Sequence, residues 1–439
     1  MLEAGSLMDR SHLLDEKQPP TPAFVIDEPL LEKFTDRFLT AKHTHWPYSI
    51  LGYSFKTNSL PWLVAFMRDR GAWAEVVSDA EYELALTLGY SPDRIVLNGP
   101  YKSRERLRTA LLGGSIVNLD AKRDVAWTIE LARELPDRDF GVGLRINWDL
   151  ETRAPGESTF GEQKSRFGFS PENGELDQAI SELKAAGVRI AGIHVHRNSR
   201  TQSLKVYQAA ATVAAEIITS RNLDLDWIDI GGGFFGSEHG SPTFDDYFQV
   251  ISETLEGVVD MERTCLITEP GGALVAVPFE FHASVVDIKE IEGQRLVVTD
   301  ASRTNIDPLL RKDKPYEISL KTQSTERLAQ QVLCGFTLVE GDRMMTLQDT
   351  PALQLDDRIV FYKVGAYTLS LQPLFIEYLP AVYVRNEDQQ LQLVRRKWGA
   401  LEYVQGSYWP QSPAEPMEDA VTLKRPVNTA RKLGAEPAI

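Results

Sequence analysis

Residues 190–233 carry the strongest fold signal in the chain, in the stretches IAGIHVH (190–196), SLKVYQAAATVAAEIITSR (203–221) and WIDIGGG (227–233). The first and third stretches are short apolar runs, which are typical of strands buried on both faces. In the middle stretch, apolar residues recur at helical spacing (Val206, Ala209, Val213 and Ile217). Together they predict a strand–helix–strand unit of a parallel sheet.

The same alternation continues from this unit in both directions. Besides 190–195 and 227–230, apolar runs predict strands at 48–55, 73–77, 94–97, 116–119, 142–146 and 265–268. Helical segments such as 120–135 separate them. Eight strands that alternate with helices predict an α/β fold, a (β/α)8 TIM-like barrel, with a doubly wound sheet as the alternative.

The pattern changes after Pro278. Apolar runs at 279–288, 295–299, 358–363 and 381–385 follow one another without long helices, which predicts an all-β domain. We therefore assign 23–277 to the barrel and 278–410 to a β-domain, although the strand-like Ala23–Ile26 could join either. The polar, proline-rich 1–22 predicts a flexible leader, and 411–439, rich in proline and charge, a disordered tail.

Composition limits the partners and the compartment. A formal net charge of -16 argues against nucleic acid or an anionic membrane as partner. Two cysteines, Cys265 and Cys334, provide neither a disulfide framework nor a metal cluster. The sequence shows no apolar run near the roughly 18 residues that span a membrane, and no secretory signal. We expect a cytoplasmic protein that binds a small molecule and no metal.

Unusual polar residues and glycines fall at the C-terminal ends of the predicted strands, where barrel enzymes place their chemistry. They are Lys56, Glu75, Ser78, Asn98, Gly99, His194, His196, Gly231–Gly233 and Glu269–Gly272. Singly, each has an ordinary explanation, such as an ion pair or a tight turn. Together they suit a planar aromatic cofactor, because Lys56 could attack a carbonyl, His196 could stack on a pyridine ring and Glu269 could keep its nitrogen protonated.

In this order, the motifs resemble those of the fold-type III pyridoxal-phosphate (PLP) decarboxylases, the family of ornithine and diaminopimelate decarboxylases. They are YSFKTN (53–58), AEVVS (74–78), SRFG (165–168), HVH (194–196), DIGGG (229–233), EPG (269–271) and GAY (365–367), within a similarity that covers about 20–398. The resemblance implies PLP as cofactor, with Lys56 as the Schiff-base lysine, His196 on the ring and Glu269 at the ring nitrogen. The other cofactor-binding positions are Glu75, Ser199, Gly231, Gly232, Gly233, Gly271 and Tyr367.

The chain also departs from the family pattern. Leu338 stands where the family has its proton-donating cysteine, and Val339 where an acidic residue often contacts the substrate, although Glu340 follows. Gly272 replaces an arginine that binds phosphate or substrate, and Arg197 could restore part of its charge. These departures concern substrate recognition and protonation, so we expect a divergent substrate and poor turnover of ornithine and meso-diaminopimelate.

The resemblance predicts an enzyme that decarboxylates an amino acid, releasing CO2 and an amine. Loss of the cysteine leaves open another PLP reaction, such as racemisation. A non-catalytic homologue is the third possibility, but retention of Lys56, His196 and Glu269 argues against it. The family forms head-to-tail homodimers with shared active sites, and we expect Arg166 to pair with Asp342 across that interface.

Overall fold

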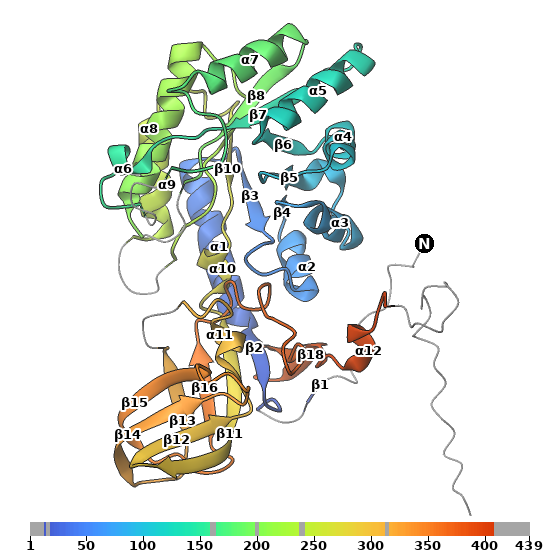
Figure 1. The fold of residues 1–439 in the computed structure, drawn as a ribbon. Helices are drawn as coiled ribbons and strands as arrows, with labels where there is room; N and C mark the ends of the chain where they lie inside the picture. The colour runs from blue at the N-terminus through green and yellow to red at the C-terminus, as the bar shows by residue number, and fades with distance from the viewer. Residues whose placement is uncertain are drawn as a thin grey trace, which may run out of the picture.

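Eight parallel strands close into a barrel, which forms the upper part of the molecule in Figure 1. The structure is a computed structural model that describes residues 13–14, 18–158, 164–197, 202–236, 242–311 and 316–407. In spatial order the barrel strands are β10 (Cys265–Thr268), β3 (Ser49–Ser54), β4 (Trp73–Val76), β5 (Ile95–Leu97), β6 (Ile116–Leu119), β7 (Gly141–Arg145), β8 (Arg189–His194) and β9 (Trp227–Asp229). The predicted barrel is confirmed, and the doubly wound alternative is wrong.

Helices connect the strands and cover the outside of the barrel (Figure 1). They are α2 (Pro61–Asp69), α3 (Asp79–Thr87), α4 (Arg104–Gly113), α5 (Lys122–Glu134), α6 (Leu150–Arg153), α7 (Glu175–Ala185), α8 (Leu204–Arg221) and α9 (Phe244–Leu255), preceded by α1 (Glu28–His45). The short α10 (Gly272–Val275) leads from β10 to the β-domain. Hydroxyl side chains begin several of them: Ser78, Ser103 and Thr243 each accept a hydrogen bond from a backbone N–H in the first turn. These caps satisfy amides that have no partner within the helix.

The Trp227 side chain fills part of the barrel interior, where Gly192 and Gly143 leave room for its indole ring. The indole of Trp227 lies so close to Gly192 that a Cβ there would be 2.1 Å from its Nε1 atom. Val96, Ala191 and Ile267 pack in the same cluster. The N-terminal end of the barrel, away from the β-domain, is therefore a packed core, which leaves the C-terminal ends of the strands for chemistry.

A second sheet of ten strands forms the β-domain below the barrel. Its path runs through β1 (Leu13–Leu14), β18 (Leu391–Arg395), β17 (Ala381–Arg385), β2 (Ala23–Asp27), β11 (Phe279–Ile291), β12 (Gln294–Thr299), β14 (Arg327–Cys334) and β15 (Arg343–Pro351). Strand β16 (Arg358–Tyr362) pairs with β11 and with β13 (Ile318–Lys321), and the short helices are α11 (Arg303–Ile306) and α12 (Ala400–Tyr403).

The structure corrects two boundaries. Strand β2 pairs with β11 and β17, so Ala23–Asp27 belongs to the β-domain sheet and not to the barrel that we assigned to 23–277. Part of the predicted leader is ordered, because β1 pairs with β18 and the Thr21 hydroxyl lies 2.7 Å from that of Ser284. The tail 411–439 lies outside the described residues.

One apolar core joins the two parts of the molecule. Phe24 and Phe281 of the β-domain belong to the same buried cluster as Phe34 and Phe38 of α1. In the part of the chain that the structure describes, no helix is both long and apolar enough to cross a bilayer. The continuous core fixes the barrel mouth against the β-domain.

Candidate active site

Lys56 follows β3 at the mouth of the barrel and faces a carboxylate from the next strand. Its Nζ atom donates a hydrogen bond to Oε2 of Glu75 at 2.5 Å, and the Glu75 side chain is buried. Burial opposes the charge of the amine, but the carboxylates of Glu75 and Glu269 outweigh it and raise the pKa of Lys56 above its usual value. The amine is therefore held protonated.

Glu269 follows β10 and belongs to a buried network of amides and carboxyl groups. The Asn98 side chain donates to Oε1 of Glu269 and, at 3.1 Å, to Oε1 of Glu75. The Asn118 amide donates to Asn98 and Asp229, each at 2.9 Å. Burial, first of all, raises the pKa of Glu269 well above its usual value and also raises that of Asp229. The two carboxyl groups retain a proton that exposed acids would lose.

Two histidines alternate with Val195 at the end of β8. Their rings lie nearly parallel, with centroids 6.3 Å apart and planes at 22°. Burial, and then the charge of Arg145, lowers the pKa of His196 to about 3, so its ring is neutral. His194, Asp229 and Glu269 are buried and place potential ligand atoms within 4.8 Å of one another.

A glycine lets the chain pass close to His196. Gly231 has a φ of 78°, and a Cβ at this position would lie 2.2 Å from the Cβ of His196. Only glycine adopts this left-handed backbone readily, and no side chain fits there. The glycine run that follows β9 is thus required by the packing of the site.

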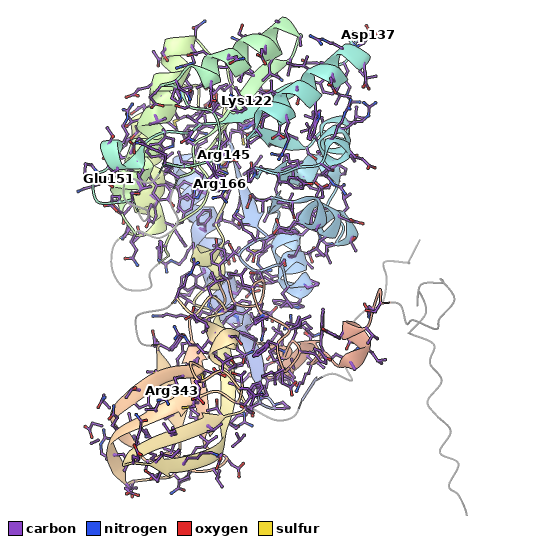
Figure 2. The ribbon with its side chains drawn as sticks, viewed as in Figure 1. Lys122, Asp137, Arg145, Glu151, Arg166 and Arg343 are labelled. Carbon is purple, nitrogen blue, oxygen red and sulfur yellow. The ribbon has the colours of Figure 1, made fainter. Side chains whose placement is uncertain are left out.

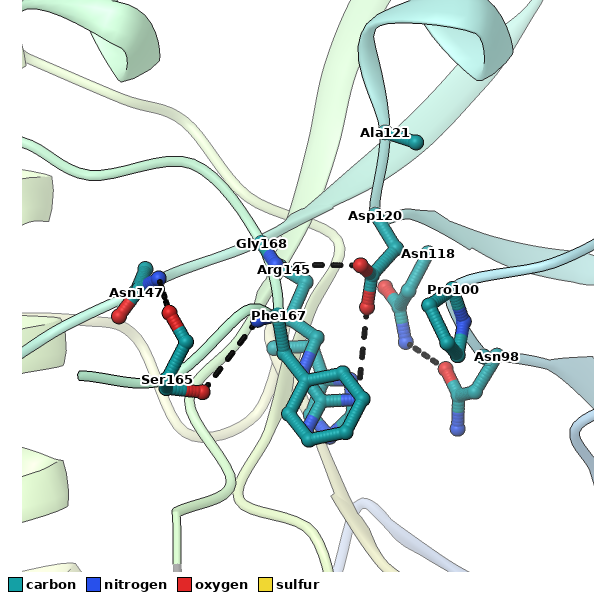
Figure 3. Close-up of polar contacts among 12 residues, drawn as sticks. Asn98, Pro100, Asn118, Asp120, Ala121, Arg145, Asn147, Ser165, Phe167 and Gly168 are labelled. Atoms are coloured by element: carbon teal, nitrogen blue, oxygen red, sulfur yellow. Dashed lines mark hydrogen bonds and ion pairs between the residues drawn. The ribbon is translucent and has the colours of Figure 1, made fainter. Parts of the chain in front are cut away.

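A second polar layer, drawn in Figure 3, supports the β6, β7 and β8 ends. Asp120 accepts the backbone N–H of Gly168 at 3.1 Å and lies 3.5 Å from the Arg145 guanidinium. That guanidinium stands over the ring of Phe167. The sequence patterns did not single out Asp120, Arg145 or Asn118. Their positions at strand ends were the available signal, but their residue types alone did not distinguish them.

A cavity of about 880 Å³ opens between these groups and the β-domain. Lys56, His196, Glu269, Gly232, Gly233, Gly271 and Tyr367 are among its lining residues. The β-domain loop that carries Tyr367 is tied to the Lys56 segment, because the Tyr367 amide donates to the Thr57 carbonyl at 2.9 Å. The Asn58 side chain donates to the Gly365 carbonyl, also at 2.9 Å. Both domains thus build one cavity.

Other predicted residues lie elsewhere. The cavity lining does not include Leu338, Val339 or Glu340, which lie exposed between β14 and β15. Leu338 is 92% exposed. Ser199 lies outside the described residues, and Arg197 is not among the lining residues either.

Asp342, which we expect at a dimer interface, is hydrogen-bonded to residues of its own chain. Its carboxylate accepts hydrogen bonds from the Ser302 hydroxyl, the Arg303 amide, and the amide and hydroxyl of Thr337. Figure 2 shows Arg166 on the barrel and Arg343, the neighbour of Asp342, on the β-domain. The pairing of Arg166 with Asp342 across an interface stays a prediction. The Arg166 guanidinium would have to compete with these four donors for the Asp342 carboxylate.

Comparison with known proteins agrees with this geometry. The family model "Pyridoxal-dependent decarboxylase, pyridoxal binding domain" matches residues 31–276. Among curated proteins, the diaminopimelate decarboxylase of Aquifex aeolicus is 23% identical over 385 residues, which cover 86% of this chain and 89% of that protein. That of Zymomonas mobilis is 27% identical over 358 residues, covering 79% and 83%.

Solved structures share the fold. The diaminopimelate decarboxylase of M. jannaschii in complex with L-lysine superposes with a TM-score of 0.77 at 22% identity, covering 89% of this chain and 92% of the other. The arginine decarboxylase of Paramecium bursaria Chlorella virus bound to agmatine gives a TM-score of 0.70 at 18% identity, covering 84% and 96%.

The residues around the cavity fit PLP, the cofactor of this family. Lys56 offers an amine for the aldehyde, neutral His196 a flat ring, and Glu269 a buried carboxyl group for the ring nitrogen. At the other end, a Cβ on Gly232 would lie 2.3 Å from the Glu269 carbonyl oxygen and one on Gly271 2.1 Å from the Thr57 hydroxyl, so bare backbone forms this wall. With the profile match over more than half its length, this chain belongs to the family of PLP-dependent decarboxylases.

Proposed function

We propose that the cavity between barrel and β-domain is the active site of an amino-acid decarboxylase, with Lys56, His196 and Glu269 as its catalytic residues. The observation that carries the proposal is their convergence on one cavity with the glycine wall and Tyr367. When bound, PLP supplies the electron sink that accepts the electron pair left as CO2 departs. The remaining steps depend on side chains of the chain itself.

Glu269 and His196 set the electronic state of the site. The proton retained by the Glu269–Asp229 pair is the one that a pyridine nitrogen needs, so Glu269 can deliver it without drawing on solvent. Neutral His196 could lie against a cationic ring without charge repulsion. Asn98 fixes the orientation of the Glu269 carboxyl group through its hydrogen bond.

Lys56 is our proposed proton donor to the substrate carbon. Neither cysteine lines the cavity, since Cys265 is buried at the start of β10 and Cys334 ends β14. Whenever its amine is not bound to the cofactor, Lys56 would be protonated, because its pKa is raised. The ammonium can then transfer a proton to the carbon that lost CO2, a role that the exposed Leu338 cannot fill.

The relatives are named for two different substrates, diaminopimelate and arginine, so their names do not select one substrate. Val339 is uncharged and lies outside the cavity lining, so it offers no partner for a distal ammonium. We propose an amino acid other than ornithine or meso-diaminopimelate.

A CO2-release screen of amino acids with the PLP-loaded protein tests the function. Borohydride reduction and peptide mapping should place the cofactor on Lys56, and Lys56→Ala should abolish release. Racemisation, the second candidate, is favoured by the absence of a thiol from the cavity lining. Inversion of the α-carbon without CO2 would establish it and refute the decarboxylase.

We further propose a cytoplasmic homodimer. Beside the cavity, the loop after Tyr367 exposes a series of apolar side chains: Leu371, Leu374, Phe375 and Ile376, each at least 41% exposed. A monomer rarely leaves such a patch in water, and patches of this kind mark interfaces. A second copy on this patch would cover the mouth of the cavity and exclude water from it.

A further inference from the structure

The described lining of the cavity offers few cations to a phosphate group. A phosphate monoester carries a charge of about -1.5 to -2 at neutral pH. The lining contains the carboxyl groups of Asp27, Glu269, Glu280 and Glu317. Among the described lining residues, the only lysines or arginines are Lys56 and Lys363. Because Lys56 is engaged with Glu75 and reserved for the aldehyde, Lys363 is the remaining candidate among these lysines and arginines.

Lys363 lines the same cavity as Gly232, Gly233 and Gly271. It lies between β16 and Tyr367, on the loop whose Gly365 amide donates to the Ala276 carbonyl at 3.2 Å. This loop packs on α10, where a Cβ at Gly272 would meet the Ala366 methyl group only at an ordinary 3.6 Å. The chain thus passes close to Gly272, which lines the cavity together with Lys363.

The backbone of Lys363 is unusual. Its φ of 59° lies in the left-handed region, which a lysine rarely adopts. Tyr367, four residues later and also a lining residue, has a φ of 56°. Such conformations concentrate at ligand-binding loops, where surrounding contacts hold them. The loop is therefore built to present both side chains.

We propose that Lys363 is the counter-cation of the PLP phosphate in this chain, and that Glu317 competes with the phosphate for it. This inference rests on the proposed function. Lys363 Nζ lies 2.6 Å from Glu317 Oε2, and both side chains are about half exposed and line the cavity. An ammonium can be shared between a carboxylate and a phosphate, whereas a buried, fully committed pair could not.

The proposal is tested by titrating the cofactor-free protein with PLP and, in parallel, with pyridoxal. Absorbance and fluorescence report the binding of each. Lys363→Gln should weaken PLP binding about tenfold, because a charge-assisted contact at a half-exposed site is lost. Pyridoxal, which has no phosphate, should bind the variant and the wild type equally. Glu317→Gln should strengthen PLP binding about two- to threefold, since the competing carboxylate is gone, and this gain should vanish in the double variant.

Lys397→Gln is the matched control. Lys397 also belongs to the β-domain and is half exposed beside a glutamate, Glu377, at 3.0 Å, but it does not line the cavity. The affinity of the Lys397→Gln protein for PLP should equal that of the wild type. Equal PLP affinity for Lys363→Gln and wild type, or an equal loss of pyridoxal affinity, would overturn the role of Lys363 alone. A wild-type protein that binds no PLP would overturn the proposed function as well.

Discussion

At the scale of single residues, Glu75 controls the protonation of Lys56. Its carboxylate raises the pKa of the amine, but attack on an aldehyde requires the neutral amine. Uptake of PLP by the cofactor-free protein should therefore accelerate as pH rises towards the pKa of Lys56. Glu75→Gln removes the charge, lowers that pKa and should shift the whole pH profile of uptake towards lower pH. Stopped-flow absorbance between pH 6 and about 10 measures both profiles, and coincident curves would contradict this role.

Glu269 is the proposed partner of the ring nitrogen. Glu269→Gln keeps the size of the side chain, but an amide cannot hold a proton on the ring nitrogen. We expect PLP to remain bound while kcat falls about 10²–10³-fold, the usual cost of losing one electrostatic contact in a transition state. The absorbance of bound cofactor serves as the control for binding. A variant with near-normal kcat would show that Glu269 does not act on the ring.

At the scale of elements, the contact between the β16–Tyr367 loop and α10 joins the two halves of the site. A Cβ on Gly365 would lie 1.9 Å from the Val275 carbonyl oxygen, and backbone cannot move aside as a side chain can. Gly365→Ala should destabilise the fold by about 1–3 kcal/mol and weaken PLP binding, because the loop carries Tyr367. Gly399→Ala, where the nearest atom is 3.8 Å away, is the control. Chemical denaturation with PLP titration measures both effects; unchanged midpoints in both variants would rule out the steric argument.

At the scale of the whole molecule, the apolar patch beside the cavity predicts assembly. Phe375→Asp places a charge where a second copy would exclude water, and should shift the protein towards monomer with loss of activity. Ile291→Asp, at a residue that is 52% exposed at the far end of β11, should change neither property. Analytical ultracentrifugation with activity measurements distinguishes the two variants. A dimeric and active Phe375→Asp protein would place the interface elsewhere.

The barrel and its candidate site could be predicted from the sequence alone. Apolar runs that alternate with helices are local patterns, and the strand-end rule then groups Lys56, Glu75, His196 and Glu269 at one mouth, although they are far apart in the chain. Local patterns are enough here, because each of these residues is recognised by its place at the end of its own strand.

Pairings between distant segments could not be predicted from the sequence and are seen in the three-dimensional structure. It placed Ala23–Asp27 in the β-domain sheet, because β11 and β17 together offer that strand two pairing edges. It also showed that Asn118 bridges Asn98 and Asp229, that Asp342 is satisfied within its own chain, and that Lys363 lines the cavity. Hydrogen bonds of this kind join residues far apart in sequence, and no local periodicity records such pairings.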